Sequence, residues 1–186
     1  MTLSAKRVLW SIRNTFQYLN EETFLLLYKS LVRPLLEYAQ EVWHCQLVMD
    51  IISVESVQRR ATKLLPALRN LPYSDRLRQL HLPTLVHRRR RGDQITTFKL
   101  VHGLNVTEKP LFTLNISRQT RGHSLKLNVT RANKTLRSRF FGLRVVKDWN
   151  ALPEHVVTAP SVNAFKSRLD KHWQNQESMY DFRALR

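Results

Sequence analysis

Residues 21–38 of the chain read EETFLLLYKSLVRPLLEY, a stretch in which apolar residues recur every three or four positions. This spacing predicts a helix with one buried face, made up of Phe24, Leu27, Tyr28, Leu31, Leu35 and Tyr38. Asn20 comes directly before Glu21 and Glu22, so we expect Asn20 to cap this helix and the two acids to favour its N-terminal dipole. Because Pro34 has no backbone N–H to donate, the helix must kink or restart there.

The segments on either side show the same helical spacing. Further helices are expected over residues 3–16, 50–65, 74–80, 83–103, 136–149 and 161–173. Ser74 is the expected cap of the 74–80 helix. The helical spacing fades after residue 104, and residues 111–116 and 124–129 show the partial apolar and polar alternation that is typical of short strands. The sequence therefore predicts a mainly α protein, a helical bundle with a small irregular β-hairpin insert.

The chain of 186 residues is strongly basic, with 31 Lys and Arg against 14 Asp and Glu and a formal net charge of +17. Charge of one sign favours a polyanionic partner, and the excess of arginine over lysine favours phosphate groups. The charge is uneven, because residues 1–50 hold five basic and five acidic residues, whereas no acidic residue occurs between Glu108 and Asp148. We predict a helical region over residues 1–103 and a basic C-terminal region with short strands and two helices over residues 104–186.

Composition also bears on the compartment. The one cysteine, Cys45, cannot form an intramolecular disulfide or a cysteine zinc cluster, which favours a reducing environment. Lys6, Arg7 and Arg13 interrupt the apolar residues of the N-terminal segment, which is not the pattern of a secretory signal. No apolar run approaches the roughly 20 residues of a membrane-spanning helix. We predict an intracellular protein that is not secreted and has no membrane partner, with the nucleus as a candidate compartment, and the sequence leaves the oligomeric state open.

The residue types that carry catalysis are scattered along the chain. No two aspartates are adjacent, and paired carboxylates would be needed to hold the two metal ions of nucleotidyl transfer. The histidines lack the His-Glu-x-x-His spacing, and no glycine-rich phosphate loop is present. Cys45 follows His44 directly, and sequence neighbours do not face each other on a helix. We therefore predict no enzymatic activity within this chain, no catalytic residue, no metal, no cofactor and no small-molecule substrate.

Clusters of basic side chains are the candidate binding residues. Arg59, Arg60 and Lys63 form one cationic edge of a helix. The consecutive residues Arg88, Arg89, Arg90 and Arg91 cannot share one helical face, so two of them must point sideways or along the core, with Asp93 as an ion-pair partner. The acid-free segment lacks local counter-charges and adds Arg118, Arg121, His123, Lys126, Arg137, Arg139 and Arg144. We predict that these clusters bind the phosphates of RNA, DNA or an RNA–DNA hybrid in a salt-sensitive manner.

Aromatic side chains near the acid-free segment offer a second kind of contact, because nucleic-acid bases stack on aromatic rings. Phe140, Phe141, Trp149 and Trp173 fall at helical spacing, which favours core packing for most of them. We expect Phe141 to be the exception that contacts bases.

A series of short motifs runs along the chain in a fixed order. The first is Leu27–Pro34, which reads LYKSLVRP, followed by Glu37–Ala39 and Trp43. The later ones are Val57–Lys63, Leu82–Pro83 with Leu85 and Arg88–Arg89, Arg121–Ser124, Phe140–Phe141 with Arg144–Val146, Asp148–Asn150, Leu152–Pro153, and Phe165–Lys166 with Leu169. This ordered set, over roughly residues 3–173, resembles the region that follows the catalytic palm in reverse transcriptases of non-LTR retrotransposons, the LINE and jockey-like elements.

The resemblance implies a thumb, here residues 1–103, and a following C-terminal region that grip the RNA template and the growing hybrid. The family's aromatic-Ala-Asp-Asp catalytic box, its fingers and its palm are not in the chain. The resemblance therefore implies a piece of a larger polyprotein or the product of a truncated element copy, which would not polymerise alone. The chain departs from the family at Glu41 and Cys45, where prolines usually flank the tryptophan, and at Ala67, where glycine is common.

Two other interpretations stay open. In one, the chain is a helical protein-interaction or scaffold module, and Arg88–Arg91 and residues 109–147 bind an acidic protein. In the other, the chain is an inert truncated relic that exposes the apolar stripe of residues 24–38 and aggregates. Affinity that falls steeply with salt for RNA, DNA and hybrid alike would favour the nucleic-acid-binding module.

Overall fold

The computed structural model describes residues 2–43, 47–105, 107–108, 110–115 and 122–184, and it confirms a mainly helical fold. The chain forms two compact units: unit 1 comprises Met1–Arg89 with Gln176–Arg186, and unit 2 comprises Arg90–Asn175. This division differs from the expected one after residue 103, because the long helix Leu85–Val101 (α7) contributes to both units. Leu85 belongs to the core of unit 1, whereas Phe98 belongs to the core of unit 2.

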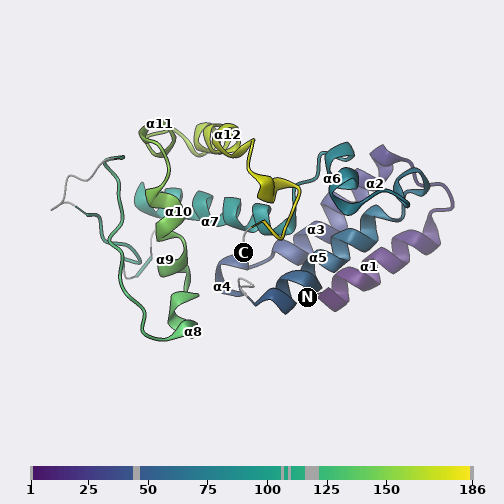
Figure 1. Ribbon diagram of the computed structural model, residues 1–186, viewed down its shortest axis with the longest axis horizontal. Coiled ribbons are helices and arrows are strands. Elements are labelled where there is room, and N and C mark those ends of the chain that lie inside the picture. The colour runs from purple at the N-terminus through teal and green to yellow at the C-terminus, as the bar shows by residue number, and fades with distance from the viewer. Residues whose placement is uncertain (1, 44–46, 106, 109, 116–121, 185–186) are drawn as a thin grey trace. The chain divides into compact units, whose positions relative to one another are not determined.

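Unit 1 is a bundle of helices around one apolar core (Figure 1). Its elements besides the start of α7 are α1 (Thr2–Thr15), α2 (Glu21–Leu27), the π-helix η1 (Tyr28–Val32), α3 (Arg33–Glu37), α4 (Gln40–Trp43), α5 (Val48–Thr62), the 3-10 turn η2 (Pro66–Leu68), α6 (Tyr73–Gln79) and the 3-10 turn η3 (Glu177–Met179). The first helix, α1, packs against α5, η1 and α3. Asn20 caps α2 as expected, because its Oδ1 accepts a hydrogen bond from Thr23 N at 2.8 Å. The expected cap at Ser74 is wrong, since α6 begins at Tyr73 directly after Pro72.

The buried face of residues 21–38 differs from the expected one in its second half. Phe24 and Tyr28 are buried, but Leu31 is 48% and Tyr38 is 76% exposed, and Val32 and Leu36 take their places in the core. The cause is the π-helical turn at Tyr28–Val32, which has more residues per turn than an α-helix and shifts the later residues around the axis. The restart expected at Pro34 is confirmed, because Pro34 lies in the first turn of α3.

Unit 2 has its own core. Its elements after α7 are α8 (Thr135–Ser138), α9 (Phe141–Arg144), α10 (Val146–Asn150), α11 (Glu154–Val157) and α12 (Val162–Trp173). Phe165 of α12 stacks on Phe98 of α7 with ring centroids 4.4 Å apart, and Trp149 of α10 lies 6.1 Å from Phe165. Ser161 caps α12 by accepting from Ala164 N at 3.1 Å. The single helix expected over residues 136–149 is instead three short ones.

The expected β-hairpin reduces to one antiparallel bridge between Leu114 and Leu127. Asn115 N donates to Lys126 O at 2.8 Å and Asn128 N donates to Thr113 O at 2.9 Å, but no strand forms among the described residues. Within the described part of the chain, none of the helices combines the length and the apolar character needed to cross a bilayer.

Candidate nucleic-acid interface

The first two arginines of the Arg88–Arg91 run lie inside unit 1. Arg88 donates through Nε and Nη2 to the two carboxylate oxygens of Glu37. Arg89 is 1% exposed, and its guanidinium lies 6.0 Å from the centre of the Trp43 ring. These contacts bear out the expectation that part of the run points toward the core rather than to solvent.

The other two arginines of the run make internal ion pairs in unit 2. Arg90 Nε donates to Asp148 at 2.9 Å, and its guanidinium lies 5.3 Å from the centre of the Trp173 ring. Arg91 donates to both oxygens of Asp170, at 2.5 and 2.8 Å. The described structure thus gives all four arginines internal contacts, which argues against a direct role in phosphate binding.

The acid-free segment also supplies side chains that the fold uses internally. Arg144 forms two bonds of 3.0 Å with Asp93, the acid that we expected to pair within the arginine run. His123 is buried, its Nε2 lies 3.0 Å from Trp149 O, and burial lowers its pKa below the ordinary value. A neutral, buried imidazole is a poor phosphate ligand, so His123 belongs to the core of unit 2.

The remaining predicted residues of this segment differ in how exposed they are. Arg137 of α8 is exposed, whereas Arg139 and Lys126 are half-buried, and Arg139 O accepts a hydrogen bond from Arg144. Arg118 and Arg121 lie outside the described residues. Of the predicted residues from this segment, Arg137 is therefore the most accessible among those that the structure describes.

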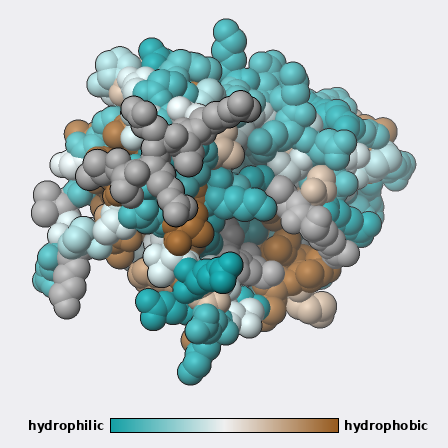
Figure 2. Space-filling model, turned by 60° about the vertical axis from the view of Figure 1, so that its left-hand side comes forward, coloured by the Kyte–Doolittle hydropathy of each residue, from teal (hydrophilic) through white to brown (hydrophobic). Residues whose placement is uncertain are grey.

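The aromatic expectation for this segment is wrong in one respect. Phe141 is buried at 6% exposure and packs against Phe112 and the Arg144 guanidinium, whereas its neighbour Phe140 is 54% exposed. A short helix starts at Phe141, so adjacent side chains point in different directions, and helical spacing alone could not tell which one faces solvent. Phe140 is one of several large apolar residues that are exposed. Figure 2 shows apolar patches among hydrophilic residues on one face of the molecule.

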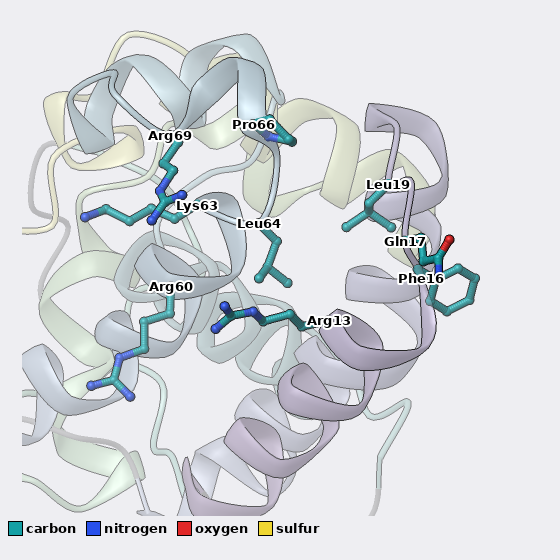
Figure 3. Close-up of a pocket in the computed structure, with 9 residues that line it drawn as sticks. All are labelled: Arg13, Phe16, Gln17, Leu19, Arg60, Lys63, Leu64, Pro66 and Arg69. Atoms are coloured by element: carbon teal, nitrogen blue, oxygen red, sulfur yellow. The ribbon is translucent and has the colours of Figure 1, made fainter.

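The end of α5 keeps its predicted cations at the surface. Arg59, Arg60 and Lys63 are all exposed, and Arg59 lies 5.8 Å from the centre of the Tyr73 ring. Arg60 and Lys63 line a pocket of about 450 Å³ in unit 1, which we call the α1–α5 pocket, together with Arg13, Phe16, Gln17, Leu19, Leu64, Pro66 and Arg69. Figure 3 shows the Arg13 side chain extending from α1 toward the end of α5.

Two cations of the α1–α5 pocket, Arg13 and Arg69, were missed in the sequence. Arg13 lies in the last turn of α1, and Arg69 follows the 3-10 turn that Pro66 begins. Neither stands in a basic run, and only the packing of α1 on α5 brings them to the same pocket. No acidic side chain lines this pocket among the described residues.

A buried hydrogen-bonded network links side chains of η1, α5 and α6 inside unit 1. Tyr73 donates to Glu55 at 2.5 Å, and Gln58 donates to Tyr73 at 3.1 Å and accepts from Tyr28 at 2.5 Å. Leu85 N donates to Glu55 at 3.1 Å. Burial raises the pKa of Glu55 to about 7, and the bond from Tyr73 and the nearby Arg89 charge oppose that rise only in part. This network joins α5, α6 and the start of α7, so its role in unit 1 is structural.

The described residues gather no group of three or more histidine, cysteine, aspartate or glutamate side chains that could hold a metal ion. The α1–α5 pocket is lined by basic, apolar and amide side chains, a combination that suits the binding of an anion. In comparisons with known proteins, no family model, no curated protein and no solved structure matches this chain.

Proposed function

We propose that the chain is a non-catalytic nucleic-acid-binding module that holds RNA, DNA or an RNA–DNA hybrid through phosphate contacts. The observation that carries this proposal is the way in which the fold divides its basic residues. One group is neutralised by carboxylates inside the units, and the other group is exposed.

The neutralised group uses four of the fourteen acidic residues of the chain. Arg88, Arg90, Arg91 and Arg144 pair with Glu37, Asp148, Asp170 and Asp93. These ion pairs add no net charge, so the net charge of +17 comes from the basic residues that lie outside them.

The exposed group lies on both units. In unit 1 it includes Arg60 and Lys63 at the end of α5, and in unit 2 it includes Lys134 and Arg137 at α8. None of these four side chains takes part in the ion pairs formed among the described residues. Exposed cations without a protein counter-charge favour phosphate, because contact with it releases the counterions that nucleic acid holds.

The thumb-like origin implied by the resemblance to LINE reverse transcriptases stays a hypothesis, and it agrees with this use of the surface. A module that grips a template or hybrid needs positive charge along the backbone and no catalytic group of its own. Contacts of this kind carry little sequence preference, because phosphates are the same at every base pair.

The test is fluorescence anisotropy of labelled single-stranded RNA, double-stranded DNA and RNA–DNA hybrid at several salt concentrations. We expect binding to all three, weakening steeply as salt rises. The salt slope is the slope of the logarithm of the binding constant against the logarithm of the salt concentration. The double variants Arg60→Gln/Lys63→Gln and Lys134→Gln/Arg137→Gln should each reduce its magnitude by about one per lost contact.

Matched controls remove the same charge elsewhere in the same unit. Arg7→Gln/Lys29→Gln is the control in unit 1, since Arg7 and Lys29 are exposed and do not line the α1–α5 pocket. Lys166→Gln/Lys171→Gln on α12 is the control in unit 2. A folded chain that ignores all three nucleic acids at low salt would overturn the proposal and favour an acidic protein as the partner.

A further inference from the structure

The α1–α5 pocket has two chemically different halves. Arg13, Arg60, Lys63 and Arg69 supply positive charge, and the apolar part consists of Phe16, Leu19, Leu64 and Pro66. In Figure 3, Phe16 and Gln17 lie at the α1 side of the pocket, away from Arg60 and Arg69. A ligand that fills the pocket therefore needs an anionic part and a flat or apolar part.

The dipoles of the two helices that end at this pocket offset only part of its positive charge. Arg13 lies in the last turn of α1, and Arg60 lies in the last turn of α5 with Lys63 at its C-cap. Each helix C-terminus carries roughly half a negative charge, so two ends offset about one of the four positive charges. The remaining excess of about three is left for a ligand.

The excess charge fits a terminal phosphate better than a phosphodiester. A phosphate monoester carries about −1.5 to −2 at pH 7 and offers three acceptor oxygens, whereas a phosphodiester inside a strand carries one negative charge. Arginine forks and a lysine ammonium are the groups that proteins use to hold such oxygens.

The apolar half fits a base. Leu19 and Leu64 pack against the core of unit 1 and are held in place by it, and in Figure 3 the Leu19 side chain points toward Leu64, whereas the Phe16 ring points away from it. The volume of about 450 Å³ lies within the range of roughly 300–1,000 Å³ that is typical of small-ligand sites.

We infer that the α1–α5 pocket binds one nucleotide with a terminal phosphate, the phosphate on Arg13, Arg60, Lys63 and Arg69 and the base against Leu19 and Leu64. The inference rests on the proposed function where that nucleotide is the end of a nucleic-acid strand. A free nucleoside monophosphate presents the same chemistry, and the experiment separates the two sources.

The experiment uses the full chain and one oligonucleotide sequence with a 5′-phosphate, a 3′-phosphate or hydroxyl groups at both ends, labelled within the strand. We expect one of the phosphorylated forms to bind about tenfold more tightly than the hydroxyl form at physiological salt. Arg60→Gln/Arg69→Gln should remove this preference, and the control Arg7→Gln/Lys29→Gln should keep it. Circular dichroism and the urea midpoint check that each variant is folded.

The outcomes separate the pocket from the wider function. Equal affinity for all three oligonucleotides, with no effect of Arg60→Gln/Arg69→Gln on any preference, would overturn the pocket assignment while the proposed function stands. If no oligonucleotide binds but adenosine monophosphate protects the chain from thermal unfolding, and Arg60→Gln/Arg69→Gln abolishes that protection, the pocket is a mononucleotide site and the proposed function is wrong. If neither oligonucleotide nor mononucleotide binds, both are overturned.

Discussion

Arg144 and Asp93, 51 positions apart in the sequence, form a two-bond ion pair inside unit 2, with Nε and Nη2 each 3.0 Å from a carboxylate oxygen. Their side chains are only 7% and 5% exposed, so the pair is shielded from water and ties α9 to α7. Arg144, which the sequence analysis predicts to bind phosphate, is therefore held in an internal ion pair.

Breaking this ion pair should destabilise the chain strongly. Asp93→Asn keeps the shape but leaves the Arg144 charge buried beside a neutral amide, which should lower the free energy of unfolding by about 3 kcal/mol. Urea denaturation followed by tryptophan fluorescence measures the loss. Replacing both partners, as in Asp93→Leu/Arg144→Met, should cost less than Asp93→Asn alone, and a double variant at least as damaging would contradict this view.

Arg88 and Arg91 should act on stability rather than on nucleic-acid binding. Arg88→Gln and Arg91→Gln each remove a partly exposed ion pair, and we expect each to lower the free energy of unfolding by about 1 kcal/mol. The salt slope of hybrid binding should stay that of the unchanged chain. A slope that falls by about one in either variant would instead place that arginine on a phosphate.

Glu55 should make stability depend on pH. Its pKa is raised from 4.5 in an exposed state to about 7 in the fold, mainly by burial, so the folded chain binds the proton more tightly than the unfolded chain. This contribution is fully present below pH 4.5 and is lost as the pH rises through 7. Relative to Glu55→Gln, the unchanged chain should lose on the order of 3 kcal/mol between pH 4.5 and 8. Urea midpoints of the two proteins that run parallel across this range would contradict the assignment.

Phe140 and Phe141 should respond oppositely to truncation. Phe141→Ala opens a cavity in a buried site and should cost about 3 kcal/mol of stability, whereas Phe140→Ala removes an exposed ring and should change stability by less than about 0.5 kcal/mol. Thermal unfolding of the two variants makes the comparison directly. A larger loss from Phe140→Ala would mean that this ring is covered in solution.

Replacing His81 by glycine should stabilise the chain. It follows the end of α6 with φ +49°, and its N–H donates to Arg78 O while Leu82 N donates to Leu77 O, which is the hydrogen-bond pattern of a Schellman motif. A non-glycine residue is strained in this left-handed conformation, so His81→Gly should raise the free energy of unfolding by about 0.5–1 kcal/mol. His81→Ala is the control, since it keeps the strain and should give no such gain.

Features that depend on neighbouring residues could be predicted from the sequence. The cap at Asn20, the restart at Pro34 and the helix start at Ser161 follow from local chemistry, and all three are confirmed. Local rules worked there because the partner of each group lies within a few residues. The exposure of Leu31 and Tyr38 could not be read from spacing, because a π-helical turn inside the same helix changes the period.

The sequence by itself determined the helical class, the net charge and which residues are basic, since these depend on composition and on spacing within single helices. Only the tertiary structure decided which basic residues are exposed. Arg90 and Arg91 form ion pairs with carboxylates 58 and 79 positions away, and the packing of α1 on α5 places Arg13 and Arg60 at the same pocket. Such pairings depend on which helix faces contact each other, and the energy that selects them comes from burying apolar surface in the cores, not from the charges themselves.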